Sequence, residues 1–160
     1  MKVYILSMQQ VNNYGSVLQA YSLKKMIESL GNEVRFLAIE KGTDDALSIQ
    51  CEKKDIDKKN DSWLETQWNR VKGKVLGNLR RVFFEFRNST GLNSVNGDEH
   101  FDTCVIGSDE VFNCLQKSKW GFSSQLFGKV EAAERVITYA ASCGSTKVDD
   151  LSDELREAIK

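Results

Sequence analysis

The 160-residue chain lacks most of the patterns that would assign a protein to a metal-dependent or membrane-spanning class. It contains no proline and a single histidine, His100, and its four cysteines form no C-x-x-C pair. Because His100 does not stand at metal-ligand spacing from any cysteine, we expect no metal site. No apolar run approaches the ~18 residues that a membrane helix needs, and we therefore expect no transmembrane segment.

The first eight residues also lack an export signal, because no small-residue cleavage site follows their short apolar run. We interpret 1–8 as a first strand and expect a cytoplasmic protein with reduced thiols. Cys143 has no base or cationic neighbour in the sequence that would hold it as a thiolate. We expect Cys143 to fill space and not to act as a nucleophile.

Two nucleotide-binding motifs and one hydrolase motif are absent as well. No G-x-G-x-x-G joins the first strand to the following helix, and no G-x-x-x-x-G-K-[ST] loop occurs, so neither a dinucleotide nor ATP is expected. There is no G-x-S-x-G, and His100 precedes any plausible serine nucleophile, which argues against a serine hydrolase. We expect no cofactor.

The opening of the chain has the pattern of a β-α-β unit. Ala20 and Leu23 share the apolar face of a helix predicted over 16–30, and Gly31 follows at the position of a C-cap glycine. Alternating residues predict a strand over 33–39. Because a β-α-β crossover joins parallel strands, we predict an α/β fold, a Rossmann-like parallel sheet with flanking helices.

The rest of the chain adds further elements of the same kind. Strands are predicted over 101–106 and 135–139, and a helix over 149–159 with Ser152 or Asp153 as its cap. These elements extend the β-α-β pattern, so the predicted sheet has at least four strands.

A long amphipathic helix is predicted in the middle of the chain. Its apolar stripe consists of Leu64, Trp68, Val71, Val75, Leu79, Val82 and Phe86. The preceding residues 40–62 are mostly charged and polar and predict a solvated, disordered connection. Neither a repeat nor a Pro/Gly/Ser-rich boundary divides the sequence, so residues 1–160 are predicted to form one domain.

Three short segments of small and polar residues follow predicted strands. They are Asn12–Ser16, Gly107–Asn113 and Ala140–Gly144. In doubly wound sheets, ligands bind outside the carboxyl ends of the strands, where helix N-termini expose backbone N–H groups. We therefore expect the three segments to line one site that handles a sugar or a phosphate.

Each segment contains a group that could bind a hydroxyl-rich ligand. The same residues also allow a purely structural interpretation. Asn13 can donate and accept hydrogen bonds, and Gly15 can present its backbone, but the same residues also suit a turn and an N-cap. Asp109 can act as a base or accept from hydroxyls, with Gly107 allowing close approach, or it can cap a short helix. Ser142 is the one hydroxyl of the third segment.

Residues 70–87 carry six basic side chains against Glu85, a net charge of +5 in a chain whose net charge is −1. This segment is a candidate for peripheral contact with an anionic membrane, at its inner face. Nucleic acid is a less favoured partner. An ordinary solvated helix face is the structural alternative, and it is favoured because the aromatic residues here are confined to three phenylalanines that the core partly claims.

Taken together, the blocks Asn13–Tyr21, Gly107–Asn113 and Tyr139–Gly144 resemble the amino-terminal half of the polysaccharide pyruvyl transferase family. The resemblance implies transfer of an enolpyruvyl unit from phosphoenolpyruvate to sugar hydroxyls, in the synthesis of cell-surface polysaccharides. The acceptor would be a sugar or a lipid-linked oligosaccharide. The implied fold is one half of a two-domain, GT-B-like transferase.

By this resemblance the chain would supply the acceptor-side domain, and the cations that hold phosphoenolpyruvate would come mostly from the other half. The chain alone is expected to lack turnover. Asp109 is implied as the catalytic or acceptor-binding residue. The implied substrate-binding residues are Asn13, Gly15, Gly107, Ser108, Asn113 and Ser142. The chain departs from the family pattern at Glu110, Phe112 and Cys143, where the family commonly has Gln, Trp and Phe.

A second class of function is open at this point. The sequence is also compatible with a non-catalytic module that holds a glycan or an anionic ligand without chemistry, or with a membrane-surface or nucleic-acid adaptor that uses 70–87. Whether 1–160 is the natural product separates the first of these from a transferase. Salt-sensitive binding to anionic vesicles or DNA separates the second.

Overall fold

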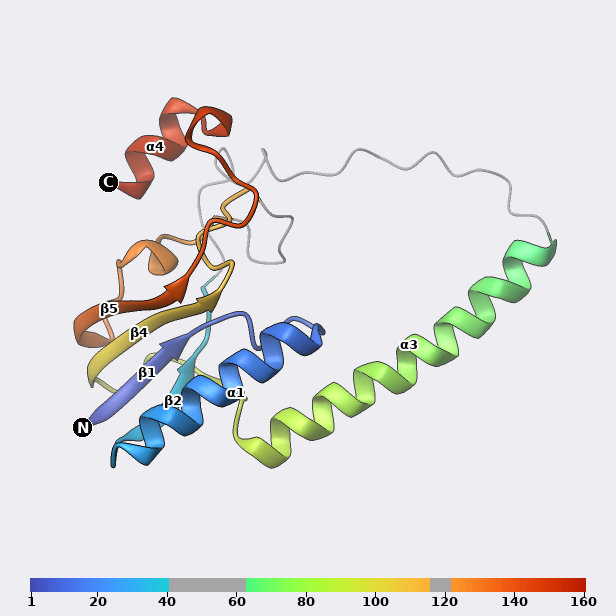
Figure 1. Ribbon diagram of the computed structural model, residues 1–160, viewed down its shortest axis with the longest axis horizontal. Coiled ribbons are helices and arrows are strands. Elements are labelled where there is room, and N and C mark those ends of the chain that lie inside the picture. The colour runs from blue at the N-terminus through green and yellow to red at the C-terminus, as the bar shows by residue number, and fades with distance from the viewer. Residues whose placement is uncertain (41–62, 116–121) are drawn as a thin grey trace. The chain divides into compact units, whose positions relative to one another are not determined.

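The computed structural model describes residues 1–40, 63–115 and 122–160, and side chains in all of these except 63–75 (Figure 1). The chain divides into two compact units. The first unit contains the described residues up to Glu40 together with Leu92–Lys160, and the second contains the helix α3 (Trp63–Thr90). Because the predicted polar connection falls almost wholly on 41–62, it lies outside the described residues.

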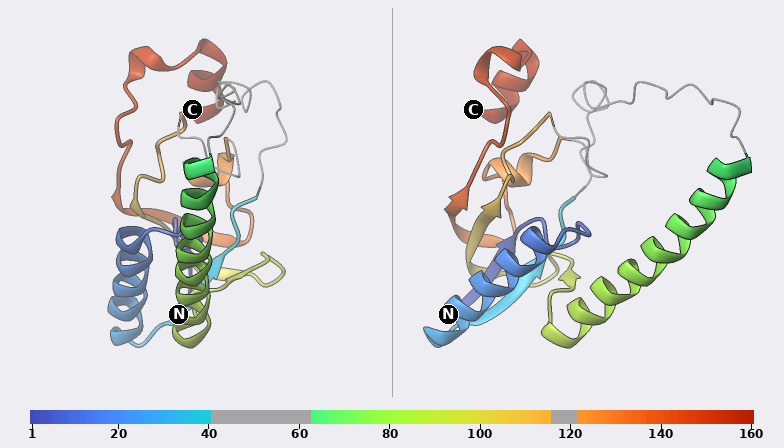
Figure 2. Two further views of the ribbon diagram at one scale, coloured as in Figure 1. Left: turned by 90° about the vertical axis from the view of Figure 1, so that its right-hand side faces the viewer. Right: turned by 45° about the vertical axis from the view of Figure 1, so that its right-hand side comes forward.

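The first unit is built on a parallel sheet of five strands in the order β3-β2-β1-β4-β5. The strands are β1 (Lys2–Leu6), β2 (Glu33–Leu37), β3 (Ser94–Val95), β4 (Phe101–Asp109) and β5 (Ala133–Ala141). The helix α1 (Tyr14–Ser29) joins β1 to β2 and runs antiparallel to them (Figure 2). The predicted α/β class is confirmed, and the fold is Rossmann-like.

The first predicted helix begins two residues earlier than expected, at Tyr14. The reason is local, because Asn13 adopts the extended N-cap conformation and its side-chain Oδ1 accepts from the Gly15 N–H at 2.7 Å. At the other end Gly31 has φ 81° and donates its N–H to Glu28 at 2.9 Å. The predicted glycine at the C-terminal end of α1 is thus confirmed.

Later elements differ from the prediction mainly in length. The strand predicted over 101–106 runs three residues further, to Asp109, so the polar Gly107–Asp109 segment is the end of β4 itself. The helix predicted over 149–159 is α4 (Asp153–Ile159), which begins after Ser152 because the Ser152 hydroxyl accepts from the Leu155 N–H. Neither the two-residue strand β3 nor the 3-10 helix η1 (Ser124–Phe127) was predicted from the sequence.

Alternating side chains of β1 and β4 build the core on the two faces of the sheet. Tyr4 and Leu6 point to the face that η1 covers, where Tyr4 stacks on Phe101 with ring centroids 3.6 Å apart. The buried members of this cluster are Tyr4, Leu6, Met8, Leu37, Ile39, Phe101, Cys104, Ile106, Val111, Leu126 and Val130. On the other face, α1 contacts β2 and β4 and buries Val17 and Leu23.

A smaller apolar cluster anchors the C-terminal part of the chain. Cys114, Phe122 and Leu155 are buried together, and α4 contacts η1. The Phe127 ring stacks on those of Phe112 and Phe122, each with centroids 5.4 Å apart. These contacts hold α4 beyond the carboxyl ends of β4 and β5 (Figure 1).

The predicted long helix is confirmed as α3, and of its predicted apolar stripe Leu79 and Phe86 are half-buried while Val82 is exposed. Val82 was expected to face the core and is 49% exposed, whereas its neighbour Phe83 is 2% exposed. The helix therefore buries the row of side chains that contains Phe83, because Phe83 has the larger apolar area to remove from water. Among the described residues, no helix combines the length and hydropathy that crossing a bilayer requires.

We predict that Gly107→Ala destabilises the first unit strongly. Gly107 has φ 121°, and a Cβ there would overlap the backbone carbonyl of Tyr139 on β5. We expect a loss of more than about 3 kcal/mol in the free energy of unfolding, or failure to fold. Gly31→Ala is the matched control, since Gly31 also has a positive φ, of 81°, but has open space around it. It should cost only about 1 kcal/mol. Equal urea midpoints for the two variants would contradict the steric argument.

Candidate functional site

The carboxyl ends of β1 and β4 meet at the point where the strand order reverses. In doubly wound sheets this is the place where ligands bind. The Ser7 hydroxyl, which follows β1 and is fully buried, donates to the backbone carbonyl of Ser108 on β4 at 3.2 Å. Since β5 lies beside β4 and ends at the same edge, three strands contribute to this part of the surface.

The second and third predicted segments are joined by backbone hydrogen bonds. The Ser142 N–H donates to the Asp109 carbonyl at 3.0 Å, and the Phe112 N–H donates to the Ser142 carbonyl at 3.0 Å. Gly107 makes the approach possible, because any side chain there would overlap β5. The structure therefore brings these two segments together, as predicted.

Side chains of the Gly107–Asn113 segment and of Thr146, which follows the third segment, form a polar cluster at this edge. The Asn113 amide donates to Glu110 Oε2 at 2.9 Å, and the Thr146 hydroxyl donates to Asn113 Oδ1 at 2.6 Å. Gly144 packs directly against this cluster, since a Cβ at Gly144 would come within 2.7 Å of the Asn113 Nδ2. We call Glu110, Asn113, Ser142 and Thr146 the strand-end cluster. Sequence analysis had assigned no role to Glu110 or Thr146.

Asp109 stands next to the strand-end cluster in an unusual backbone conformation. Its φ is 86°, a value that aspartate tolerates better than most residues. One carboxylate oxygen, Oδ1, accepts from the Glu110 N–H at 2.9 Å, which fixes the side chain. Residues 110–115 form turns and no helix, so the alternative that Asp109 caps a short helix is wrong. Asp109 is half-buried, and its carboxylate lies at the edge of the sheet.

Ser108 does not occupy the position that its predicted role requires. It is 7% exposed, and among the described residues its hydroxyl has no hydrogen-bond partner. Strand alternation after Gly107 carries Ser108 inward, while its carbonyl accepts from Ser7. Ser108 therefore supports the edge from inside and does not present its hydroxyl to solvent.

The first predicted segment lies at the N-terminus of α1, on the same side of the sheet as the ends of β4 and β5 (Figure 1). Asn13 uses its Oδ1 for the N-cap, so its structural interpretation is confirmed. Both Asn13 and Gly15 are exposed. No hydrogen bond joins either of them to the strand-end cluster within the part of the chain that the structure describes.

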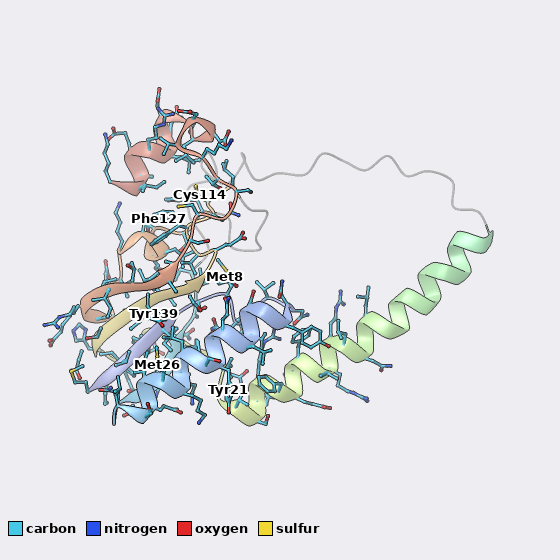
Figure 3. The ribbon with its side chains drawn as sticks, viewed as in Figure 1. Met8, Tyr21, Met26, Cys114, Phe127 and Tyr139 are labelled. Atoms are coloured by element: carbon cyan, nitrogen blue, oxygen red, sulfur yellow. The ribbon has the colours of Figure 1, made fainter. Side chains whose placement is uncertain are left out.

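An apolar cavity of about 300 Å³ opens beside the strand-end cluster. Phe112, Cys114 and Phe127 line it, with Thr146 and Lys147 at its polar side. Figure 3 shows Cys114 and Phe127 between this edge of the sheet and α4. The cavity offers aromatic surface next to hydrogen-bonding groups, the combination that sugar rings use. This cavity was not predicted from the sequence, because its walls come from four separate parts of the chain.

A second, more polar cavity of about 360 Å³ lies at the ends of β1 and β2. Ser7, Gln9 and Ser94 are among its lining residues, and Gln9 Nε2 donates to the Ser94 hydroxyl at 2.9 Å. The polar side chains that line this cavity extend the polar edge of the sheet toward β3. No predicted site residue lies in it.

Of the described cysteines, Cys104 and Cys114 are buried and Cys143 is exposed. Cys104 is fully buried, and burial raises the pKa of its thiol to about 12. Cys143 is exposed near the strand-end cluster. Within residues 1–40, 63–115 and 122–160, no group of three His, Cys, Asp or Glu side chains is placed to hold a metal ion.

Comparison of the chain with protein-family models, with curated proteins and with solved structures finds no match. The fold class therefore stands on the strand order and parallel pairing described above. The resemblance to pyruvyl transferases remains a prediction.

We predict that the hydrogen bond between Asn113 and Thr146 stabilises the strand-end cluster. Asn113→Ala and Thr146→Val should each cost about 1 kcal/mol of unfolding free energy. The double variant should lose clearly less unfolding free energy than the sum of the two single variants, because each single substitution already removes the same hydrogen bond. Urea denaturation of the four proteins measures this coupling. Strict additivity would show that the two side chains do not interact.

We also predict that the buried and exposed thiols react differently at pH 8. A thiol with a pKa of about 12 is almost entirely protonated at that pH, so Cys104 should resist iodoacetamide until the chain unfolds. Cys143 should be alkylated in the native state, because it is exposed. Peptide mass spectrometry after brief labelling distinguishes the two. Rapid native labelling of Cys104 would contradict the described core.

Proposed function

We propose that the strand-end cluster and Asp109 bind the sugar acceptor of a polysaccharide pyruvyl transferase, and that this chain supplies the acceptor-side half of a GT-B-like enzyme. The observation that carries the proposal is the hydrogen-bonded joining of the Gly107–Asn113 and Tyr139–Gly144 blocks at one sheet edge. These are two of the three blocks on which the family resemblance rests.

The chemistry of the edge favours a sugar over an anionic ligand. Asp109 and Glu110 contribute carboxylates, and Asn113, Ser142 and Thr146 contribute neutral hydrogen-bonding groups. Carboxylate and amide groups suit the hydroxyls of a sugar, and the neighbouring aromatic cavity suits its apolar face. Phosphoenolpyruvate carries two anionic groups and needs convergent cations. Its binding site would therefore lie mainly outside this edge.

In the proposed reaction an acceptor hydroxyl attacks the enol carbon of phosphoenolpyruvate. The methylene carbon takes up a proton as the sugar oxygen bonds to the enol carbon, which gives a tetrahedral intermediate; loss of a proton from the new methyl group then expels inorganic phosphate as the carbon–oxygen bond to phosphate breaks. Asp109 accepts the proton of the attacking hydroxyl. Addition of a second sugar hydroxyl across the enol double bond then closes the ketal without a further leaving group.

The geometry of Asp109 is compatible with this role. Its Oδ1 is held by the Glu110 N–H, so the carboxylate has a defined orientation. Its second oxygen makes no hydrogen bond to any described residue. A base must be fixed and still have a free acceptor position, and Asp109 meets both requirements.

We predict that Asp109→Asn in the complete enzyme lowers turnover by a factor of at least about 10. Asparagine also tolerates a positive φ, so folding should be unchanged. The assay is phosphate release from phosphoenolpyruvate in the presence of the acceptor. Asp98→Asn is the matched control, since it removes the same charge from an exposed position before β4, at the opposite edge of the sheet. Wild-type turnover of Asp109→Asn would remove Asp109 from the mechanism.

The same assay separates this proposal from a non-catalytic glycan-binding module. Saturable binding of the acceptor by this chain, with no phosphate release even from the complete protein, would favour the binding module. Failure of the chain to bind any acceptor sugar would overturn both.

A further inference from the structure

The helix α3 exposes an unusual amount of apolar surface for a helix with its charge. Among its described side chains, Phe84 is 62% exposed, Leu76 is 50% exposed and Val82 is 49% exposed. An isolated exposed leucine is ordinary, but a largely exposed phenylalanine within a basic segment is not.

The exposed groups follow the rows of side chains along the helix. Leu76, Arg80 and Phe84 are four residues apart, so they form one continuous row on the helix surface, and all three are exposed. The neighbouring row contains Phe83 and Arg87, which are both buried. The helix therefore separates a buried row from an exposed row that alternates apolar and basic groups.

The structure also shows which basic residues can act on a partner. Arg87 lies over the Phe83 ring at 5.5 Å, and burial lowers its pKa, so Arg87 does not belong to the exposed charge. Arg81 is exposed and pairs loosely with Glu85 at 3.7 Å. Arg80 is exposed as well.

The sequence of the helix adds charge of one sign only. Between Glu65 and Glu85 it contains no acidic residue and five basic ones. These are Arg70, Lys72, Lys74, Arg80 and Arg81. The complementary partner is therefore an extended anionic surface, and not a single anion.

We propose that α3 lies on an anionic lipid bilayer, with Phe84 and Leu76 inserted at the headgroup boundary and the exposed Arg80 and Arg81 on the lipid phosphates. Amphipathic helices with this combination lie in the plane of the interface. Burial of phenylalanine, leucine and valine in a bilayer lowers the free energy, because their apolar surface leaves water. The phosphate backbone of a nucleic acid offers no apolar surface on which aliphatic side chains could be buried. The proposal does not depend on the catalytic role of the strand ends.

The test is sedimentation of the full chain with phosphatidylcholine vesicles, with and without phosphatidylglycerol, at low and high salt. We expect binding only to the anionic vesicles and weaker binding at high salt. Phe84→Ser should weaken the partition by about tenfold, and Arg80→Gln should weaken it by about fivefold. Both side chains are exposed, so neither variant should change the circular dichroism spectrum.

Two control variants match these changes outside α3. Leu30→Ser removes an apolar side chain that is 75% exposed, and Lys129→Gln removes an exposed basic charge. Neither should change vesicle binding. The proposal is overturned by an absence of binding at low salt, by equal binding to neutral vesicles, or by a Phe84→Ser variant that binds like the wild type. Binding to duplex DNA that Phe84→Ser leaves unchanged would identify a nucleic-acid surface instead.

Discussion

The parallel pairing of β1 with β4 is the constraint on which the rest of the first unit depends. It joins residues one hundred positions apart, with Val3 beside Thr103 and Leu6 beside Ile106. This pairing makes β1 the central strand and reverses the direction in which strands are added. Because all five strands are parallel, their carboxyl ends lie at one edge. The Ser7–Ser108 hydrogen bond and the strand-end cluster follow from that arrangement.

Much of the fold was predictable because its signals are local. The caps at Asn13, Gly31 and Ser152 depend on a residue and its immediate neighbours, and each is observed. The apolar run of β1 and the alternation in β2 likewise depend on residues within one strand. By contrast, β3 has two residues and no pattern, so only its pairing with β2 defines it. The choice between Val82 and Phe83 for the buried row also depended on packing and not on spacing.

The site was predictable in its position but not in its details. Gly107–Asn113 and Ala140–Gly144 were expected at strand ends, and parallel pairing of β4 with β5 brings them together. The contacts of Asn113 with Glu110 and Thr146 depend on the close approach of β5 to β4 at Gly107. No sequence pattern predicts that approach. Ser108 was misplaced for the same reason, because an extended β4 turns its hydroxyl inward. Asp109 lies at the strand end where it was expected, and the hydrogen bond from the Glu110 N–H fixes the orientation of its carboxylate.

We propose that the carboxyl ends of β4 and β5 form a sugar-binding edge. The most direct test of this proposal is an amide chemical-shift titration of the full chain with a panel of disaccharides from cell-surface polysaccharides. The account predicts saturable shifts concentrated at 109–113 and 142–146, at the strand ends and the adjoining cavity. Saturable shifts confined to the cavity around Gln9 and Ser94, or no saturable shifts for any sugar, would contradict it.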